Sequence, residues 1–515
     1  MSERTVRRWL TLALLLLLSA SSAAAQRKGA KNPLDKSFDA LVDTLLAEWK
    51  VPGIGLAVVK GNEVILLKGY GYKDLEAKAP VTPQTKFAIG SVTKSFVVTG
   101  LAAQVKAKKA AWDEAIRTYL PDFRMYDDEA TERMTIRDLV THRSGLPRHD
   151  LMWYGSPLTR EELYHRLQYL PPTKEFRSYW QYQNLMFMTA GYLSGKLHGT
   201  SWENTVKSLV FEPLGMTTAD ASVDDLQRSA DYAFPYSAER DKPAKRMPFR
   251  NLDAVGPAGS INSSVEEMSY YLRMHMAGGS FNGKEVIAKG DAFQMQAPQM
   301  VMPSAPPSPF QDTELGHQQY GMGLFITTYR GHKLVHHGGN IDGFSAELSF
   351  LPDDSLGVMV LTNLNGTPVR DFLPRYVYDR LLGLDRIDWN GRFKERRERG
   401  YARQDSLQKV AAEKRKTGTQ QSHALAAYAG SYEHPGYGKI TIGTAGSALS
   451  FKFNSFEMPL KHFHYDVFET DPPEGNRLEA KVQFHMNPDG EIDALSLPIE
   501  QALPPTRFEK AREKK

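Results

Sequence analysis

A serine and a lysine three residues apart carry the first recognisable chemistry in the chain. Ser91 and Lys94 directly precede an apolar run, residues 96 to 105, which predicts a helix. Such a helix would place both side chains on one face of its N-terminal turn, near the positive end of the helix dipole. A serine hydroxyl beside a lysine amine suits a nucleophile whose proton is removed by a neighbouring base. The spacing alone decides nothing, because a second Ser-x-x-Lys occurs at residues 406 to 409 in a charged stretch.

Two polar residues further along the chain supply more of such a site. Tyr182 and Asn184 begin a predicted apolar helix after a proline-rich approach. A serine hydrolase that lacks a histidine–aspartate pair still needs a base. Lys94 can act as that base if burial or nearby charge lowers its pKa, and Tyr182 can act if Lys94 stabilises its phenolate, so both are candidates. The Asn184 amide could hold a substrate carbonyl by hydrogen bonds.

A turn rich in histidine and glycine follows between two predicted strands. His336 and His337 are neighbours there, so we expect only one of them to face a site, and we expect it to be His336. Glycine at an antiparallel edge allows close approach of the backbone, and a backbone N–H there could form an oxyanion hole together with the N–H of Ser91.

Each of these side chains also has a purely structural explanation. Ser91 and Asn184 are both suitable helix N-caps, and Tyr182 could be a core aromatic whose hydroxyl is satisfied. Trp153 and Tyr154 could line a substrate cleft or pack beneath a loop. The three groups occurring together and in order is what favours catalysis over these explanations.

The elements that must position these residues alternate between helical and strand periodicity. Residues 148 to 170 are predicted to be a surface excursion that contains a helix from Thr159. Residues 386 to 424 are highly charged and predict a linker helix or an exposed excursion. Residues 426 to 510 hold short strands at regular spacing, which predict a small all-β barrel or sandwich. The other expected elements are helices over 38–49, 135–147, 265–275 and 370–382, and strands over 54–59, 63–68, 320–326, 333–335, 345–350 and 356–362.

The length and composition of the chain indicate how many domains it has and which classes of protein it can belong to. A chain of 515 residues predicts two or three domains, and 41% hydrophobic with 24% charged residues is typical of a globular protein. The net charge of +4 comes with no basic cluster interleaved with aromatics, so nothing indicates nucleic acid. The absence of cysteine excludes disulfides, thiolate catalysis and thiolate metal sites. A basic start, an apolar core over residues 9 to 18 and small residues before Gln26 predict a signal peptide over 1–25, and a periplasmic or secreted protein.

With these motifs in order, the chain resembles the serine β-lactamase and penicillin-binding protein superfamily. It is most similar to the branch that holds class C β-lactamases, family VIII esterases and serine D-amino-acid peptidases. Flanking segments agree with the resemblance, at residues 139–147, 213–216, 257–259, 320–323 and 343–344. The resemblance covers about residues 38 to 383. Residues 426 to 510 resemble the lipocalin-like β-barrel domain that follows such catalytic domains in some members of this branch.

The resemblance implies an α/β (α+β) fold, with an antiparallel sheet flanked by helices and a helical subdomain forming one wall of the cleft. Ser91 would form an acyl-enzyme, while Lys94 and Tyr182 handle the protons. The site residues matched to the family motifs are Ser91 and Lys94 (nucleophile motif), Tyr182 and Asn184 (Tyr-x-Asn motif), His336 and Gly338 (in place of Lys-Thr-Gly), and Gly339 (oxyanion N–H). Because His336 replaces the family's lysine, which helps to hold a β-lactam carboxylate, the substrate shifts away from β-lactams.

The sequence therefore predicts an exported serine hydrolase that acts on an ester or a peptide amide, including peptides with D-amino acids. It is expected to need no metal and no organic cofactor, and its partner is a small-molecule or peptide substrate. Two alternatives remain open: a penicillin-binding sensor that acylates slowly or not at all, and a weak β-lactamase.

Overall fold

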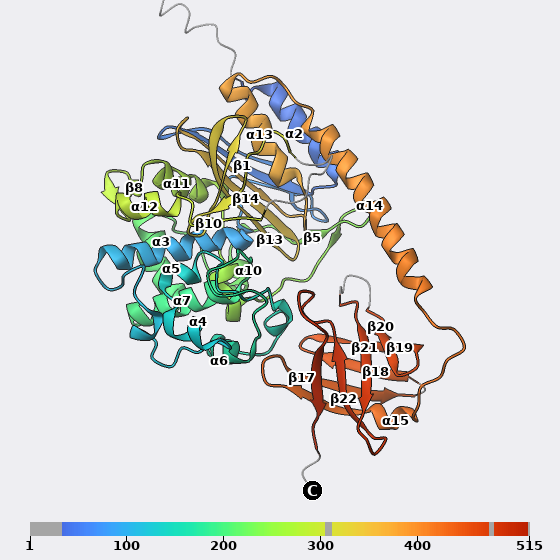
Figure 1. The fold of residues 1–515 in the computed structure, drawn as a ribbon. Helices are drawn as coiled ribbons and strands as arrows, with labels where there is room; N and C mark the ends of the chain where they lie inside the picture. The colour runs from blue at the N-terminus through green and yellow to red at the C-terminus, as the bar shows by residue number, and fades with distance from the viewer. Residues whose placement is uncertain (1–32, 241, 304–311, 447, 473–477, 513–515) are drawn as a thin grey trace, which may run out of the picture.

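The computed structural model describes residues 33–240, 242–303, 312–446, 448–472 and 478–512. The signal peptide predicted over residues 1–25 lies outside these ranges. Within them, no helix combines the length and the apolar character that a bilayer crossing requires. The described chain forms a sheet-and-helix domain, which ends with helix α13 (Val369–Leu382), and a closed β-barrel; the long helix α14 (Trp389–Glu413) runs between them (Figure 1).

A nine-stranded antiparallel sheet forms the centre of the first domain. Its middle strands are buried because helices cover both faces: β15 is largely apolar, β14 alternates apolar and polar residues, and every residue of both strands is buried. In spatial order the strands are β10 (Met300–Val301), β11 (Gln319–Tyr320), β12 (Phe325–Tyr329), β13 (His332–Ile341), β14 (Phe344–Leu351), β15 (Leu356–Thr362), β1 (Gly53–Lys60), β2 (Glu63–Asp74) and β3 (Ala79–Pro80). The predicted antiparallel sheet flanked by helices is confirmed.

Different helices cover the two faces of the sheet, and alternate residues of each strand contact them. On β1, Ala57 belongs to the core shared with α3 and α11, whereas its neighbour Leu56 belongs to the core shared with α2 and α13. The bounds of the covering helices not yet given are α2 (Lys36–Trp49), α3 (Thr93–Lys106) and α11 (Val265–Met276). A side chain on a central strand therefore faces either the α3 side or the α13 side, and its position along the strand decides which.

A helical subdomain lies beside the α3 face (Figure 1), and its helix α7 packs on α3. The remaining helices of this domain are α4 (Asp128–Arg133), α5 (Ile136–Leu139), α6 (Arg160–Arg166), α7 (Leu185–His198), α8 (Trp202–Val206), α9 (Glu212–Leu214), α10 (Val223–Arg228) and α12 (Lys289–Met295). Short 3-10 helices lie among them: η1 (Gly90–Val92), η2 (Ile116–Thr118), η3 (Asp150–Met152), η4 (Leu167–Tyr169) and η6 (Asp253–Ala258). A π-helical segment, η5 (Lys207–Phe211), joins α8 to α9. Two-residue strands complete this domain: β4 (Phe87–Ala88), β5 (Tyr236–Ser237), β6 (Lys245–Arg246), β7 (Asn262–Ser263), β8 (Ser280–Phe281) and β9 (Lys284–Glu285).

The C-terminal unit is an eight-stranded barrel that closes by pairing its first and last strands. A short helix α15 (Leu425–Tyr428) precedes strands β16 (Gly430–His434), β17 (Gly438–Ala445), β18 (Ala448–Phe453), β19 (Phe456–His464), β20 (Val467–Thr470), β21 (Lys481–Met486), β22 (Ile492–Leu497) and β23 (Thr506–Lys510). Alternate residues along each strand point into the barrel, and its interior is filled by aromatic side chains such as Phe451, Phe453 and Phe484. The predicted small all-β barrel is confirmed.

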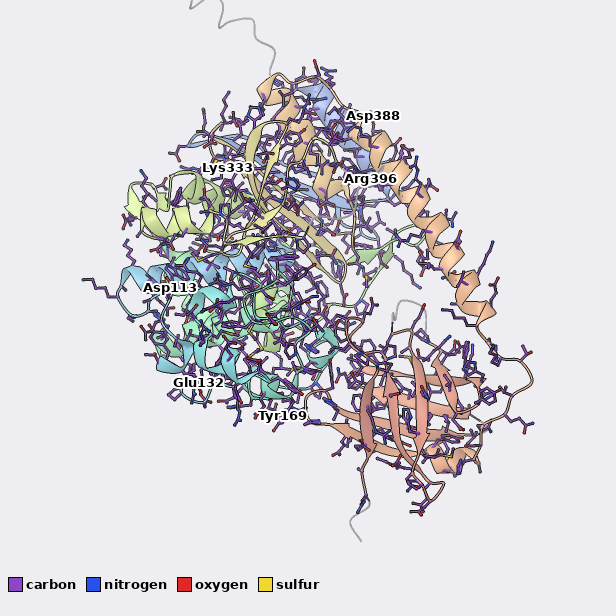
Figure 2. All side chains as sticks on the ribbon, in the orientation of Figure 1. Asp113, Glu132, Tyr169, Lys333, Asp388 and Arg396 are labelled. Carbon is purple, nitrogen blue, oxygen red and sulfur yellow. The ribbon has the colours of Figure 1, made fainter. Side chains whose placement is uncertain are left out.

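Helix α14 carries charged side chains along its length; Figure 2 labels Arg396 within it and Asp388 directly before its first residue. It is fixed to the first domain by a shared carboxylate: Arg396 of α14 and Arg375 of α13 both donate to Asp312, the latter at 2.8 Å. The charged linker thus contains a helix that is solvated along most of its surface.

The segment from residue 148 to 154 departs from the predicted surface excursion. His149 and Met152 are fully buried, and the barrel contacts this segment through hydrogen bonds to His149 and Leu151. The predicted helix does begin after Thr159, whose side chain caps α6. The barrel contact is long-range in sequence, which is why local patterning did not indicate the burial.

Candidate active site

Ser91 is held at the entry of α3 by a tight backbone turn. Gly90 has φ +53, a conformation that glycine adopts without cost, and the neighbouring Ile89 N–H donates to Ile261 O at 2.9 Å. Gly90 and Val92 are buried while Ser91 is partly exposed. The turn therefore presents one hydroxyl to the cleft at the N-terminal end of a fourteen-residue helix.

Lys94 is completely buried one turn further on, and its amine reaches three oxygen atoms. Its Nζ lies 3.1 Å from Ser91 Oγ, 2.8 Å from Asn184 Oδ1 and 2.7 Å from the carbonyl oxygen of Ala258. Burial, reinforced by the positive charge of Arg148, lowers the pKa of Lys94 well below its usual value. A neutral amine has two N–H groups and one lone pair. The amide and carbonyl oxygens can accept the two N–H groups, which leaves the lone pair for the Ser91 proton.

Tyr182 stands beside both residues. The Lys94 amine lies 4.9 Å from the centre of its ring, and its hydroxyl shares a hydrogen bond with Ser91. Burial raises the pKa of Tyr182 to about 12, although the Ser91 hydrogen bond and the charge of Arg148 oppose that rise. His142 supports the ring from behind, with centroids 4.4 Å apart. Tyr182 is therefore protonated near neutral pH and can donate a proton.

Asn184 occupies the N-cap position of α7, yet its side chain makes no capping hydrogen bond in the described structure. Its Oδ1 accepts from Lys94 and its Nδ2 donates to Asp150 Oδ1 at 3.1 Å. The amide thus links the buried lysine to a carboxylate at the cleft. The purely structural N-cap role considered for this residue does not describe its contacts.

The structure corrects the expectation about the two histidines. On β13, His337 is paired with Leu348 and faces the α3 side, whereas His336 faces the α13 side and binds Glu347, with Nδ1–Oε1 at 2.9 Å. The His337 ring lies 6.3 Å from the Tyr182 ring, and its Nε2 is 3.2 Å from the hydroxyl of Tyr320. The physical reason is the two-residue period of a strand, which sends neighbours to opposite faces.

Burial, followed by the nearby charge of Lys94, lowers the pKa of His337 to about 3. The imidazole is therefore neutral at physiological pH. It is in place to share a hydrogen bond with the Tyr320 hydroxyl, but it brings no positive charge of its own to the site.

The glycines after the histidines let β13 approach the nucleophile. A Cβ placed on Gly339 would lie 1.9 Å from Ile89 O and 3.2 Å from the backbone nitrogen of Ser91. A Cβ placed on Gly90 would lie 2.6 Å from the backbone nitrogen of Asn340. Backbone N–H groups of this stretch and of Ser91 therefore lie close together. Gly338 lies on the opposite face, near Glu347 and Arg370.

Two residues that the sequence interpretation did not select also belong to the site. Arg148 is exposed to the cleft and lies over the Tyr182 ring, 5.3 Å from its centre, while its Nε donates to Asp150 Oδ2 at 2.5 Å. Asp150 in turn holds Asn184. Both residues directly follow the matched segment 139–147, and that adjacency was the only sequence signal for them.

A cavity of about 1220 Å³ opens beside the site, between the first domain and the barrel. Its lining includes Asp150, Tyr154 and Arg250 of the first domain and Ser455 and Phe456 of the barrel, and does not include Ser91. Space of this size accommodates a substrate larger than a single amino acid. The cavity meets the catalytic residues through Asp150.

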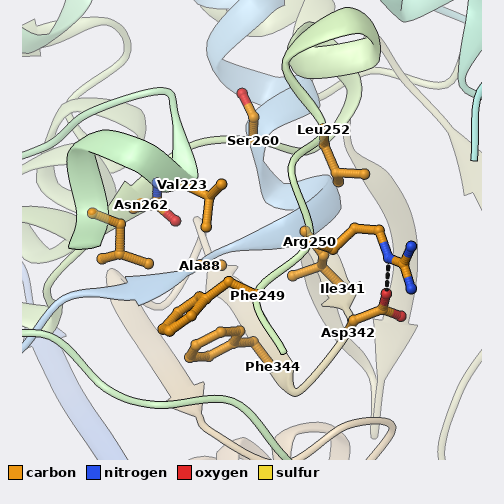
Figure 3. Close-up of a pocket in the computed structure, with 11 residues that line it drawn as sticks. Ala88, Val223, Phe249, Arg250, Leu252, Ser260, Asn262, Ile341, Asp342 and Phe344 are labelled. Atoms are coloured by element: carbon orange, nitrogen blue, oxygen red, sulfur yellow. Dashed lines mark hydrogen bonds and ion pairs between the residues drawn. The ribbon is translucent and has the colours of Figure 1, made fainter. Parts of the chain in front are cut away.

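A much smaller pocket of about 20 Å³ lies on the other side of an ion pair (Figure 3). Arg250 Nε donates to Asp342 Oδ2 at 2.6 Å, and both residues line the small pocket and the large cavity. Figure 3 shows the rings of Phe249 and Phe344 beside each other in the small pocket. It has room for about one water molecule, so the large cavity is the candidate substrate space.

The described part of the chain holds no group of three or more histidine, aspartate or glutamate side chains placed to bind a metal ion. The chemistry of the site is that of a hydroxyl, an amine, a phenol and an imidazole. Together these can activate a nucleophile and transfer its proton, while the backbone N–H groups of Ser91 and of the stretch after Gly338 can stabilise an oxyanion.

Comparisons with known proteins identify the family of the chain and relatives that share its fold. The family model described as Beta-lactamase matches residues 38–382, and a model described as a domain of unknown function, DUF3471, matches residues 414–511. The unguisins hydrolase ungD′ of Aspergillus campestris is 27% identical over 430 residues, which cover 80% of this chain and 78% of that protein.

Two solved structures share the fold. The octameric penicillin-binding protein homologue of Pyrococcus abyssi has a TM-score of 0.59 and 22% identity, over 92% of this chain and 99% of that chain. The D-amino acid amidase of Ochrobactrum anthropi SV3 has a TM-score of 0.55 and 22% identity, over 71% of this chain and 100% of that chain.

Proposed function

Because the chain belongs to the Beta-lactamase family, we propose that it is a serine hydrolase that works through an acyl-enzyme on Ser91. One observation carries the proposal: a fully buried lysine amine lies 3.1 Å from the Ser91 hydroxyl, and two other oxygen atoms accept its N–H groups. A lysine that only stabilised the fold would gain nothing from facing a serine hydroxyl in a dry environment. A general base requires that arrangement.

Acylation follows from the contacts. Lys94 Nζ takes the proton from Ser91 Oγ, and the oxygen attacks the substrate carbonyl carbon. The negative charge that develops on the carbonyl oxygen is bound by the Ser91 N–H and by an N–H of the Gly339–Asn340 stretch. The tetrahedral intermediate collapses, and the leaving amine or alcohol takes a proton from the Lys94–Tyr182 pair. Water then attacks the Ser91 ester and gives a proton to the same pair. The bond between the acyl carbon and Ser91 Oγ breaks, Oγ takes that proton back, and the acid is released.

Lys94 is the better candidate for the general base. Its pKa is lowered by burial, whereas burial raises the pKa of Tyr182 to about 12. Tyr182 then acts as the proton donor to the leaving group, with its hydroxyl already hydrogen-bonded to Ser91. Asn184 holds the Lys94 amine in position by accepting its hydrogen bond, and its amide can also bind the substrate.

The substrate that fits best is a peptide amide or an ester. On this wall His337, and not a lysine, faces the site, and it is neutral, whereas the family's lysine helps to hold the carboxylate of a β-lactam. One relative is named an unguisins hydrolase and one structural neighbour a D-amino acid amidase, which supports amides as the class to examine first. Weak β-lactamase activity is the second candidate, supported by the intact Ser91 and Lys94.

A penicillin-binding sensor would keep Ser91 but would not need a route for water and proton transfer during deacylation. The presence of Lys94 and Tyr182 beside the same hydroxyl favours turnover. The experiment is a panel of D- and L-amino-acid amides, short-chain p-nitrophenyl esters and a chromogenic cephalosporin, assayed with the native protein and Ser91→Ala. Ser91-dependent hydrolysis of an amide or an ester is expected. Stable labelling by penicillin without any turnover would support the sensor instead.

We also propose that the protein is exported, from the basic start, apolar core and small residues of positions 1–25. The mature chain would then begin at Gln26. Cell fractionation followed by N-terminal sequencing checks this, and a mature protein that retains Met1 in the cytoplasm would contradict it.

A further inference from the structure

The barrel contacts the segment that lies directly beside the catalytic groups. His149 separates Arg148, which lies over Tyr182, from Asp150, which holds Asn184. His149 has φ +47, a left-handed conformation that is uncommon for a residue with a side chain, and it is fully buried. Such a conformation persists only where the surroundings fix it.

Much of what fixes His149 comes from the barrel. Its backbone N–H donates to Glu500 Oε2 at 2.8 Å, and its ring Nδ1 lies 2.5 Å from the hydroxyl of Tyr437. Its Nε2 lies 3.1 Å from the carbonyl oxygen of Pro171 in the first domain. Three hydrogen bonds, two of them across the domain boundary, therefore hold a residue in a strained backbone conformation.

The barrel also holds the other end of the segment. Asn454, in the turn between β18 and β19, donates its amide to Leu151 O at 2.7 Å and to Tyr154 O at 3.1 Å. The ring of Phe456 stacks on Tyr154, with centroids 5.9 Å apart and planes 21° apart. Together these contacts fix both ends of the segment that carries Asp150.

We propose that Tyr437, Asn454 and Glu500 of the barrel are positioning residues of the active site. They hold residues 148 to 154 so that Asp150 keeps Asn184 against Lys94. The proposal rests on the proposed function for its catalytic readout. The line of contacts is continuous, from Glu500 through His149 to Asp150, then through Asn184 to Lys94 and Ser91. The barrel is then part of the catalytic machinery and not only a neighbour of the cleft.

Two variants of the full-length protein test this. Glu500→Ala removes the acceptor of the buried His149 N–H. Asn454→Gly removes the amide but keeps the turn, since Asn454 has φ +51 and glycine tolerates that conformation. The matched control is Glu457→Ala, an exposed barrel glutamate that pairs only with Lys452 among the described residues. The double variant Asn454→Gly/Glu500→Ala is expected to lower kcat/KM about tenfold or more, while Glu457→Ala leaves it unchanged.

The pH profile distinguishes positioning from mere loss of stability. If the segment loosens, Lys94 loses its burial and the charge of Arg148, which lower its pKa and together outweigh the charge of Asp150, which raises it. The pKa of Lys94 then rises, so the acid limb of kcat/KM moves to higher pH in the double variant. A purely structural contact would lower the melting temperature without moving that limb.

Backbone hydrogen exchange measures how firmly the barrel holds this segment, and it does so without relying on catalytic activity. Faster backbone exchange in residues 149–155 and at the start of α7 is expected in the double variant, with the β1 and β14 amides unaffected. Unchanged kcat/KM, pH profile and exchange in a folded double variant would overturn the proposal. A native protein that hydrolyses nothing would contradict the proposed function, and the exchange data would still decide whether the barrel holds this segment.

Discussion

The imidazole of His337 lies 6.3 Å from the phenol ring of Tyr182, on the face of β13 that borders the nucleophile. Its neighbour His336 points to the opposite face and binds Glu347. The histidine that borders the catalytic phenol is therefore the second of the pair, and the two histidines should differ in what their loss does.

We expect His337→Asn to lower kcat/KM about tenfold or more, which corresponds to about 1.4 kcal/mol of transition-state stabilisation. The hydroxyl of Tyr320 loses its partner and the wall behind Tyr182 loosens. His336→Asn serves as the matched control, with kcat/KM close to native and a lower melting temperature because Glu347 loses a partner. Steady-state kinetics and thermal unfolding measure the two effects. The opposite ranking would show that the face assignment has no catalytic meaning.

Lys94→Arg should lower kcat/KM by about 10²-fold or more, because a guanidinium stays protonated and cannot accept the Ser91 proton. Lys106→Arg, at the exposed end of the same helix, is the control and should be unaffected.

In the native protein, the lowered pKa of Lys94 means that the base is active above that pKa and is lost as the pH falls through it. The acid limb of kcat/KM should therefore lie well below the ordinary lysine value of about 10.4. An acid limb near 10 would contradict a buried, neutral Lys94. The pH–rate profile for a neutral ester substrate provides this measurement.

Gly339→Ala should remove most activity, because a Cβ there would lie 1.9 Å from Ile89 O and would push β13 away from Ser91. Gly400→Ala is the control: it lies within α14 with open space around it, and alanine in a helix is favoured over glycine by about 1 kcal/mol. Measuring kcat/KM and the melting temperature of both variants separates a loss of activity from a loss of stability. A fully active Gly339→Ala protein would exclude the close approach of β13 as a requirement.

Asp138 should be a strong determinant of stability. The side chain is fully buried and accepts hydrogen bonds from Arg143 at 2.5 Å and from Arg177 at 2.7 Å. Asp138→Asn leaves two guanidinium groups without their charge partner, so the free energy of unfolding should fall by about 3–5 kcal/mol. Asp113→Asn, which breaks the exposed pair with Arg137, should cost about 1 kcal/mol or less.

The pH dependence of that contribution has a defined sign. Burial raises the pKa of Asp138, but the hydrogen bond and charge of Arg177 and Arg143 outweigh it, so the pKa in the folded protein is lowered. The stabilisation is then present above the unfolded value of about 3.9 and is lost as the pH falls through the folded value. Urea unfolding at several pH values should show the loss in the native protein and not in Asp138→Asn. Equal acid sensitivity of both proteins would contradict it.

The sequence predicted the parts of the fold that depend on local periodicity. The antiparallel sheet, its covering helices and the terminal barrel each follow from alternation or helical spacing within one segment. Ser91, Lys94, Tyr182 and Asn184 were found because their order along the chain matched a known arrangement, and the structure brings them together.

The sequence could not decide features that depend on register or on distant contacts. A shift of one residue exchanges the faces of His336 and His337, and nothing in their shared residue type distinguishes them. The burial of His149 depends on the barrel, and Asn454 is 303 residues away from the carbonyl of Leu151 that it binds. Arg148 and Asp150 were missed for the same reason, since no local pattern indicates a contact of that range.

The most direct measurement is the intact mass of the protein after treatment with a fluorophosphonate, followed by peptide mapping. We expect one covalent adduct per chain, located on Ser91, absent from Ser91→Ala and much slower to form in Lys94→Arg. An adduct on another residue, or equal labelling of Ser91→Ala, would contradict Ser91 as the nucleophile.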